Sequence, residues 1–67
     1  MWAVVYIAQN KAKAEKIRDM LTAEGLLVNL RGIDGADPDN ISRSVEILVP
    51  ESEAEEAHEI INDILSV

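Results

Sequence analysis

The stretch of residues 44–51 constrains the fold of this chain more than any other, because it reads as a strand, a stop and a helix start in succession. Alternate residues of this stretch are apolar and share one face of an extended strand: Val45, Ile47 and Val49. Leu48 makes the opposite face partly apolar as well. Because a strand that is apolar on both sides belongs inside a sheet, we expect residues 44–49 to form the central strand.

A helix is expected immediately after this strand. Pro50 closes the strand, and Ser52 followed three residues later by Glu55 matches the capping-box pattern. Apolar residues then recur at the spacing of one helix face: Ala54, Ala57, Ile61, Ile64 and Leu65. The predicted helix therefore begins near Ser52 and buries this stripe.

The first strand is predicted over residues 2–8, which are apolar throughout. Strict alternation divides them into two faces, with Ala3, Val5 and Ile7 toward the helices and Trp2, Val4 and Tyr6 toward the outside. A strand of this composition has apolar side chains to bury on both sides.

The next two elements follow from capping residues and periodicity. Asn10 is a suitable N-cap for a helix over about residues 11–24, and Gly25 supplies the left-handed residue that ends it. The buried stripe of this helix is Ala14, Ile17, Met20 and Leu21. Residues 26–31 form the second strand, with three residues directed inward: Leu26, Val28 and Leu30. The connection over residues 32–42 is rich in Gly, Asp, Pro and Asn, which favour turns.

These elements give the order β-α-β-β-α within one domain, residues 1–67. A right-handed crossover makes the first two strands parallel, and the third strand fits between them, antiparallel to both. The predicted fold class is α+β. It is a ferredoxin-like split βαβ unit truncated by one strand, with a three-stranded sheet in the order 1-3-2 and two helices on one face.

This arrangement leaves the other face of the sheet uncovered. The apolar residues expected on that face are Trp2, Val4, Tyr6, Leu27 and Leu48. Exposed contiguous apolar patches mark contact sites, and the first strand is also an unpaired sheet edge. We therefore expect a homodimer, formed by pairing of edges or by stacking of sheets. An unidentified protein partner is a further candidate, and the alternative is a monomer whose large side chains shield each other.

Charge and composition limit the partners and the cellular compartment that we expect. Thirteen acidic and six basic residues give a net charge of −7, which repels nucleic acids and anionic membrane surfaces. We expect neither as a partner. The chain has no cysteine, which fits a reducing compartment, and its apolar start lacks the basic region of a signal peptide. The expected location is therefore the cytoplasm.

Residue types that carry catalysis or bind metals are sparse. The one histidine, His58, has no second imidazole at ligand spacing. Asp34, Asp37 and Asp39 lack the spacing of a calcium-binding loop, so an acidic loop is the simpler interpretation. We expect no enzymatic activity, no cofactor and no metal ion.

One cluster of polar residues indicates a ligand site. In the predicted topology, the ends of the first two strands and the start of the third lie at the same sheet edge, beside the N-terminus of the first helix. The candidate binding residues there are Asn10, Lys11, Arg31 and Arg43. Helix amides and these cations favour a phosphate, a carboxylate or a nucleotide. The alternative is that the nearby aspartates neutralise the cations.

Three motifs span nearly the whole chain: a strand ending in Asn10, a helix of the Ala-x-x-Ile-x-x-x-Leu type ending in Glu24-Gly25, and the Val-Glu-Ile-Leu-Val-Pro-Glu junction at residues 45–51. In these motifs the chain resembles a family of short bacterial proteins of unknown function that is labelled as signal-transducing. The resemblance implies a ferredoxin-like domain akin to the nitrogen-regulatory PII trimers. The family has no established activity or catalytic residues to carry over. The nucleotide binding of the PII proteins does not transfer, because this chain lacks their long loop at the expected place and a basic phosphate-binding run.

The sequence therefore predicts a small, non-catalytic regulatory or interaction module that acts as a homo-oligomer. The second interpretation is a sensor of a small anion or nucleotide, bound at the Asn10, Lys11 and Arg31 end.

Overall fold

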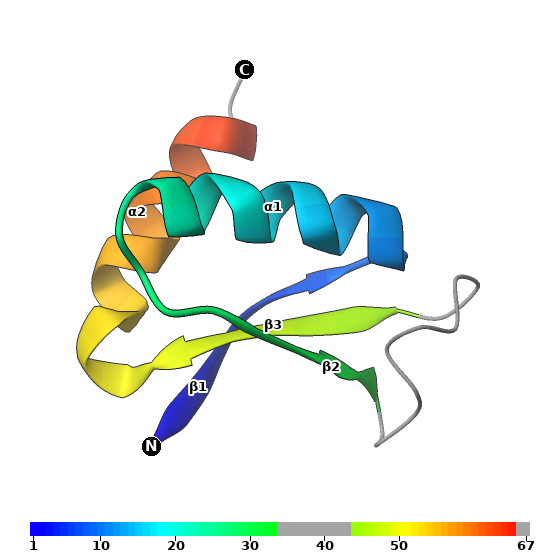
Figure 1. Ribbon diagram of the computed structural model, residues 1–67, viewed down its shortest axis with the longest axis horizontal. Helices are drawn as coiled ribbons and strands as arrows, with labels where there is room; N and C mark the ends of the chain where they lie inside the picture. The colour runs from blue at the N-terminus through cyan, green and yellow to red at the C-terminus, as the bar shows by residue number, and fades with distance from the viewer. Residues whose placement is uncertain (34–43, 66–67) are drawn as a thin grey trace.

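The computed structural model describes residues 1–33 and 44–65, and its elements follow one another in the predicted order (Figure 1). They are strand β1 (Trp2–Ala8), helix α1 (Lys11–Ala23), strands β2 (Asn29–Gly32) and β3 (Val45–Pro50), the 3-10 turn η2 (Glu51–Glu53) and helix α2 (Ala54–Leu65). Most of the expected connection over residues 32–42 lies outside the described residues. No helix in the two described ranges is long and apolar enough to cross a membrane.

The sheet has the order β1-β3-β2, and β3 runs antiparallel to both of its neighbours. This confirms the prediction that β3 is the central strand. Both helices lie on one face of the sheet (Figure 1), so that the opposite face, here called the outer face, is covered by neither of them. The ladder of β2 begins at Asn29, which makes this strand shorter than the predicted residues 26–31.

The core lies between β3 and the two helices. The residues at its centre are those that strand alternation and helical spacing predict: Val45, Ile47, Val49, Ala14, Ile17, Leu21, Ala57 and Ile61. Leu48 points away from this cluster and is nevertheless buried. The central strand is therefore buried on both sides, as its composition requires.

Both ends of α1 are capped by the predicted residues. Asn10 has an extended backbone, and its side-chain oxygen accepts a hydrogen bond of 2.9 Å from the amide of Lys13. At the other end, Gly25 has a φ of +90°, and the amide of Leu26 donates to the carbonyl of Leu21 at 3.2 Å. This left-handed cap reverses the chain and directs Leu26 into the core.

The junction between β3 and α2 differs from the prediction. Helical structure begins at Glu51, directly after Pro50, so that Ser52 lies inside the turn η2 and does not cap it. The reason is that Pro50, with φ −58° and ψ 145°, already has the extended geometry of the residue before a helix. Glu53 takes a different role, because its Oε1 accepts a hydrogen bond of 3.1 Å from the amide of Leu27. It ties η2 to the segment before β2.

A β-bulge in β1 changes the faces that strict alternation predicts. The ladder passes directly from Val4 to Tyr6, so that Val5 is an extra residue without a partner in β3. From Tyr6 onward, the strand alternates in the opposite sense. The expected orientations of Tyr6 and Ile7 are therefore wrong: Tyr6 packs against the core on the helix side, and Ile7 lies on the outer face.

Candidate functional site

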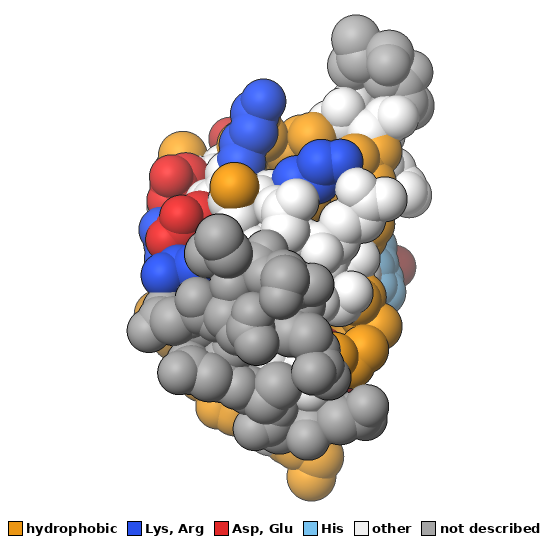
Figure 2. Space-filling view, turned by 90° about the vertical axis from the view of Figure 1, so that its right-hand side faces the viewer, with side chains coloured by type: hydrophobic (Ala, Val, Ile, Leu, Met, Phe, Trp, Pro, Cys, Tyr) orange, Lys and Arg blue, Asp and Glu red, His pale blue; other side chains and the backbone are white. Residues whose placement is uncertain are grey.

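The outer face carries four exposed apolar side chains. They are Trp2 (47% exposed), Val4 (41%), Ile7 (49%) and Leu27 (64%), and in Figure 2 hydrophobic side chains are visible along the lower edge, where the sheet lies. Leu48 is only 3% exposed. These five residues are called the outer patch below. Four of them were predicted from the sequence, and Ile7 takes the place expected for Tyr6.

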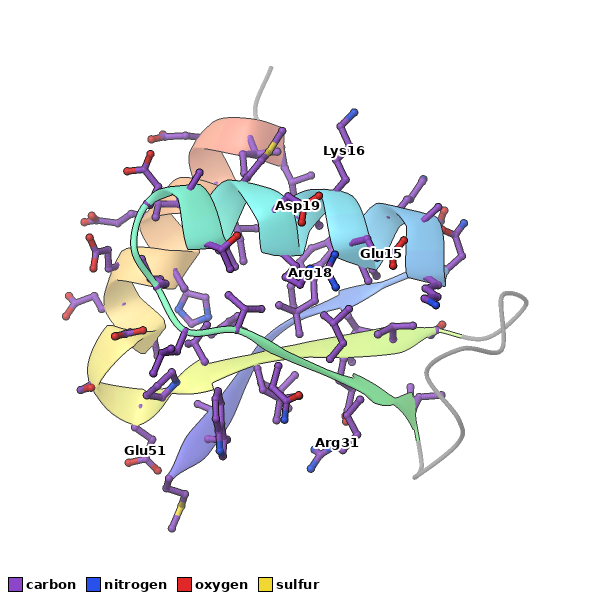
Figure 3. All side chains as sticks on the ribbon, in the orientation of Figure 1. Glu15, Lys16, Arg18, Asp19, Arg31 and Glu51 are labelled. Carbon is purple, nitrogen blue, oxygen red and sulfur yellow. The ribbon has the colours of Figure 1, made fainter. Side chains whose placement is uncertain are left out.

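An ion pair balances the charge next to the outer patch. Arg31 of β2 faces Glu46 of β3 in the ladder, and the distance between Arg31 Nε and Glu46 Oε1 is 2.7 Å. Figure 3 shows Arg31 pointing away from the helices. A pair that is this exposed contributes little to stability. It does remove net charge from the border of an apolar surface.

The strand ends meet at one edge of the sheet, as predicted. Ala8 at the end of β1 and Gly32 at the end of β2 both pair with Val45 at the start of β3. Asn10 and Lys11 follow at the start of α1, next to this edge. The backbone geometry that motivated a ligand site there is therefore present.

Among the described residues, the side chains proposed for that ligand site are not brought together. The side-chain oxygen of Asn10 is occupied by the helix cap. Arg31 projects from the outer face to Glu46, whereas Lys11 begins α1, which covers the other face. Arg43 lies outside the described residues. The sheet thus separates Arg31 from the start of α1.

A cavity that the sequence did not reveal lies on the helix side, between the end of β1, α1 and the last turn of α2. Its volume is about 400 Å³. Its apolar walls come from all three elements: Tyr6, Ala8, Ile17, Met20, Ile64 and Leu65. Three polar residues complete the lining: Gln9, Lys13 and Lys16. We call it the helix-side cavity.

Some of the residues that line this cavity share one helix flank by their spacing in the sequence. Lys13, Ile17 and Met20 recur at the spacing of one helix flank, and Met20 was expected to be buried. In the structure Met20 is partly exposed, because it borders the cavity. Tyr6 had no such signal, since only the bulge turns it toward the helices.

Metal-binding and buried polar groups are absent from the part of the chain that the structure describes. Within residues 1–33 and 44–65, no three His, Cys, Asp or Glu side chains lie close enough together to hold a metal ion. No polar or charged residue in these ranges is buried, and His58 is exposed. The candidate surfaces are therefore the outer patch and the helix-side cavity.

Comparison with protein-family models, curated proteins and solved structures finds no match to this chain. The resemblance to the bacterial signal-transducing family therefore stays a prediction, and the outer patch and the helix-side cavity are the features that indicate a function.

Proposed function

We propose that this chain is a small, non-catalytic interaction module of regulatory type in the cytoplasm, which acts as a homodimer by stacking its outer patch on that of a second copy. The observation that carries this proposal is the grouping of Trp2, Val4 and Ile7 on one uncovered face, each more than two fifths exposed. A contiguous apolar patch of this kind is typical of contact sites.

Charge limits the faces through which two copies can meet. The chain carries a net charge of −7, so two copies repel each other least when they meet through a surface with few unpaired acidic residues. The acidic residues of the C-terminal part crowd η2 and α2: Glu51, Glu53, Glu55, Glu56, Glu59 and Asp63. Beside the outer patch, Glu46 is paired with Arg31, and Figure 3 shows Glu51 at one end of the sheet. Stacking of outer faces keeps most of the acidic groups apart.

Stacking is preferred over pairing of strand edges. The free edge of the sheet on this side is β1, and its ladder is interrupted at Val5. Bulges twist an edge strand and oppose its extension by another strand. A second copy that added to this edge would also leave the outer patch exposed. Face-to-face contact covers the patch without using the interrupted edge.

The size of the face sets the expected strength of the dimer. The strands of the sheet have four to seven residues, so at a rise of about 3.3 Å per residue the face is at most about 23 Å long. Three strands about 4.8 Å apart give such a face roughly 300 Å² per copy, which is below the area of a standard specific interface. We therefore expect a weak dimer, with a dissociation constant between about 10 µM and about 1 mM.

Sedimentation equilibrium over this concentration range tests the proposal. We expect the average mass to rise from that of the monomer toward that of the dimer. Val4→Glu places a carboxylate in the centre of the contact and should weaken association at least about tenfold. Ala12→Glu is the matched control, because it adds the same charge at an exposed position of α1. A wild-type chain that remains monomeric at about 1 mM, or equal effects of the two substitutions, would contradict the proposal.

A further inference from the structure

We infer that the helix-side cavity is a binding site for a medium-chain aliphatic carboxylate. The alkyl chain lies against the apolar walls, and the carboxylate lies beside Lys13 and Lys16. The site is independent of the proposed dimer, because the sheet separates the cavity from the outer patch. It also differs from the ligand site predicted at the strand ends, since neither Arg31 nor Lys11 lines the cavity.

The cavity walls suit an alkyl chain because they are aliphatic on three sides. Ala8 and Ile17 form part of the buried core and border the cavity from β1 and α1. Ile64 of α2 and Met20 of α1 complete these walls, and the flexible thioether of Met20 adapts to ligands of different shape. Tyr6 adds an aromatic ring that the bulge has turned inward. An alkyl chain bound here removes apolar surface from water on both partners.

The charge around the cavity favours an anion. Lys13 and Lys16 lie about one turn apart on the same flank of α1, and no Asp or Glu is among the described residues that line the cavity. The acidic residues of α1 lie elsewhere on the helix. Figure 3 shows Glu15 and Asp19 on the side where Arg18 lies, with Lys16 pointing away from them. In a chain of net charge −7, this is a local reversal of sign.

The two lysines are available to a ligand in different ways. Lys13 Nζ donates a hydrogen bond of 2.9 Å to Gln9 Oε1, which holds the ammonium group near the cavity without neutralising it, because an amide carries no charge. Lys16 makes no ion pair with any residue that the structure describes. A carboxylate placed between them gains charge-assisted hydrogen bonds.

The volume of the cavity sets the length of the ligand. Small-molecule sites commonly measure about 300 to 1,000 Å³, and this cavity, at about 400 Å³, is at the small end. At roughly 30 Å³ for each non-hydrogen atom, the share of one water molecule in the liquid, the cavity holds about twelve such atoms. Decanoate has this size. Longer chains extend into solvent and gain less from each further methylene.

A titration followed by NMR tests this inference. Decanoate added to the protein should shift the methyl signals of Ile17, Met20 and Ile64 in a saturable way. The indole signal of Trp2, on the outer face, should stay in place. In a series from hexanoate to decanoate, each added methylene should tighten binding by up to about fourfold. Decanol, which has the same chain and no charge, should bind at least about threefold more weakly than decanoate.

Two matched substitutions test Lys16 as an anion-binding group. Lys16→Gln should weaken decanoate binding about three- to tenfold while leaving decanol binding unchanged. Arg18→Gln removes the same charge from the other flank of α1 and should leave both affinities unchanged. Both positions are on the surface, so neither change should unfold the protein. Equal binding of decanoate and decanol, equal effects of the two substitutions, or the absence of saturable shifts would overturn the inference.

Val4→Glu separates this inference from the proposed function. That variant should be monomeric and should still bind decanoate with the affinity of the wild type. If the NMR shifts of the cavity residues vanish together with dimerisation, the site on the helix side is not independent and the inference is overturned. A wild-type chain that is monomeric and binds decanoate would refute only the proposed dimer.

Discussion

Gly25 carries the turn from α1 into the segment before β2. Its φ of +90° is one that L-residues with a side chain rarely adopt. A Cβ added at this position meets no atom within 4 Å, so a substitution there acts through the backbone and creates no steric clash. The change in the free energy of unfolding caused by Gly25→Ala therefore measures only the cost of the left-handed backbone conformation.

Gly25→Ala should lower the free energy of unfolding by about 1 to 2 kcal/mol. Gly25→Asn should lower it by less, because asparagine tolerates this conformation better. Urea unfolding followed by circular dichroism measures both. An alanine variant as stable as the wild type would show that the cap relaxes to another backbone geometry.

The β-bulge at Val5 could not be predicted from the pattern of residues. Residues 2–8 are apolar at every position, so their order contains no contrast from which an extra residue could be recognised. The consequence is large for the neighbours, since the shift by one position sends Tyr6 to the helix-side cavity and Ile7 to the outer patch. In a strand that alternates apolar and polar residues, the same bulge would have been visible as two apolar residues in succession.

At the scale of elements, the central strand β3 determines the architecture. A substitution at Leu48 tests whether the outer side of β3 is buried. Leu48 and Leu27 have identical side chains and lie on the outer side of the sheet, but only Leu48 is buried. Leu48→Ala should lower the free energy of unfolding by about 2 to 4 kcal/mol, whereas Leu27→Ala should change it by less than about 0.5 kcal/mol.

Thermal and urea unfolding at low protein concentration measure both changes without a contribution from association. A small effect of Leu48→Ala would mean that the outer side of β3 is not packed in the monomer. A large effect of Leu27→Ala would mean that Leu27 is buried in solution.

The topology could be predicted because β3 is apolar on both sides and because a right-handed crossover makes β1 and β2 parallel, with room for β3 between them. Arg31 is kept apart from the start of α1, where the predicted ligand site also has residues, for a reason already present in the alternation of β2. Leu30 packs against the core, so its neighbour Arg31 must project from the outer face and cannot reach the start of α1. Ser52 is not the cap because Pro50, in an extended conformation, stands before the helical turn two residues earlier. The cavity depends on how two helices meet a bulged strand, and local patterns do not encode this.

At the scale of the whole molecule, two candidate surfaces lie on opposite sides of a three-stranded sheet. The outer patch is apolar with a neutralised border, and the helix-side cavity is apolar with two lysines beside it. Salt therefore acts on the two in opposite directions. It screens the repulsion between two chains of net charge −7, and it also screens the attraction between lysines and a carboxylate.

Raising the NaCl concentration from about 10 mM to about 300 mM shortens the screening length from about 30 Å to less than 8 Å. Over this range, dimerisation measured by sedimentation should strengthen severalfold, because the apolar contact is retained while the repulsion falls. Decanoate binding measured by NMR should weaken severalfold, and Lys16→Gln should reduce this dependence on salt. Decanol binding, which involves no ligand charge, is the control and should stay constant. Weaker dimerisation at high salt would point to a contact made by charged groups, and decanoate binding that did not respond to salt would exclude the lysines from the site.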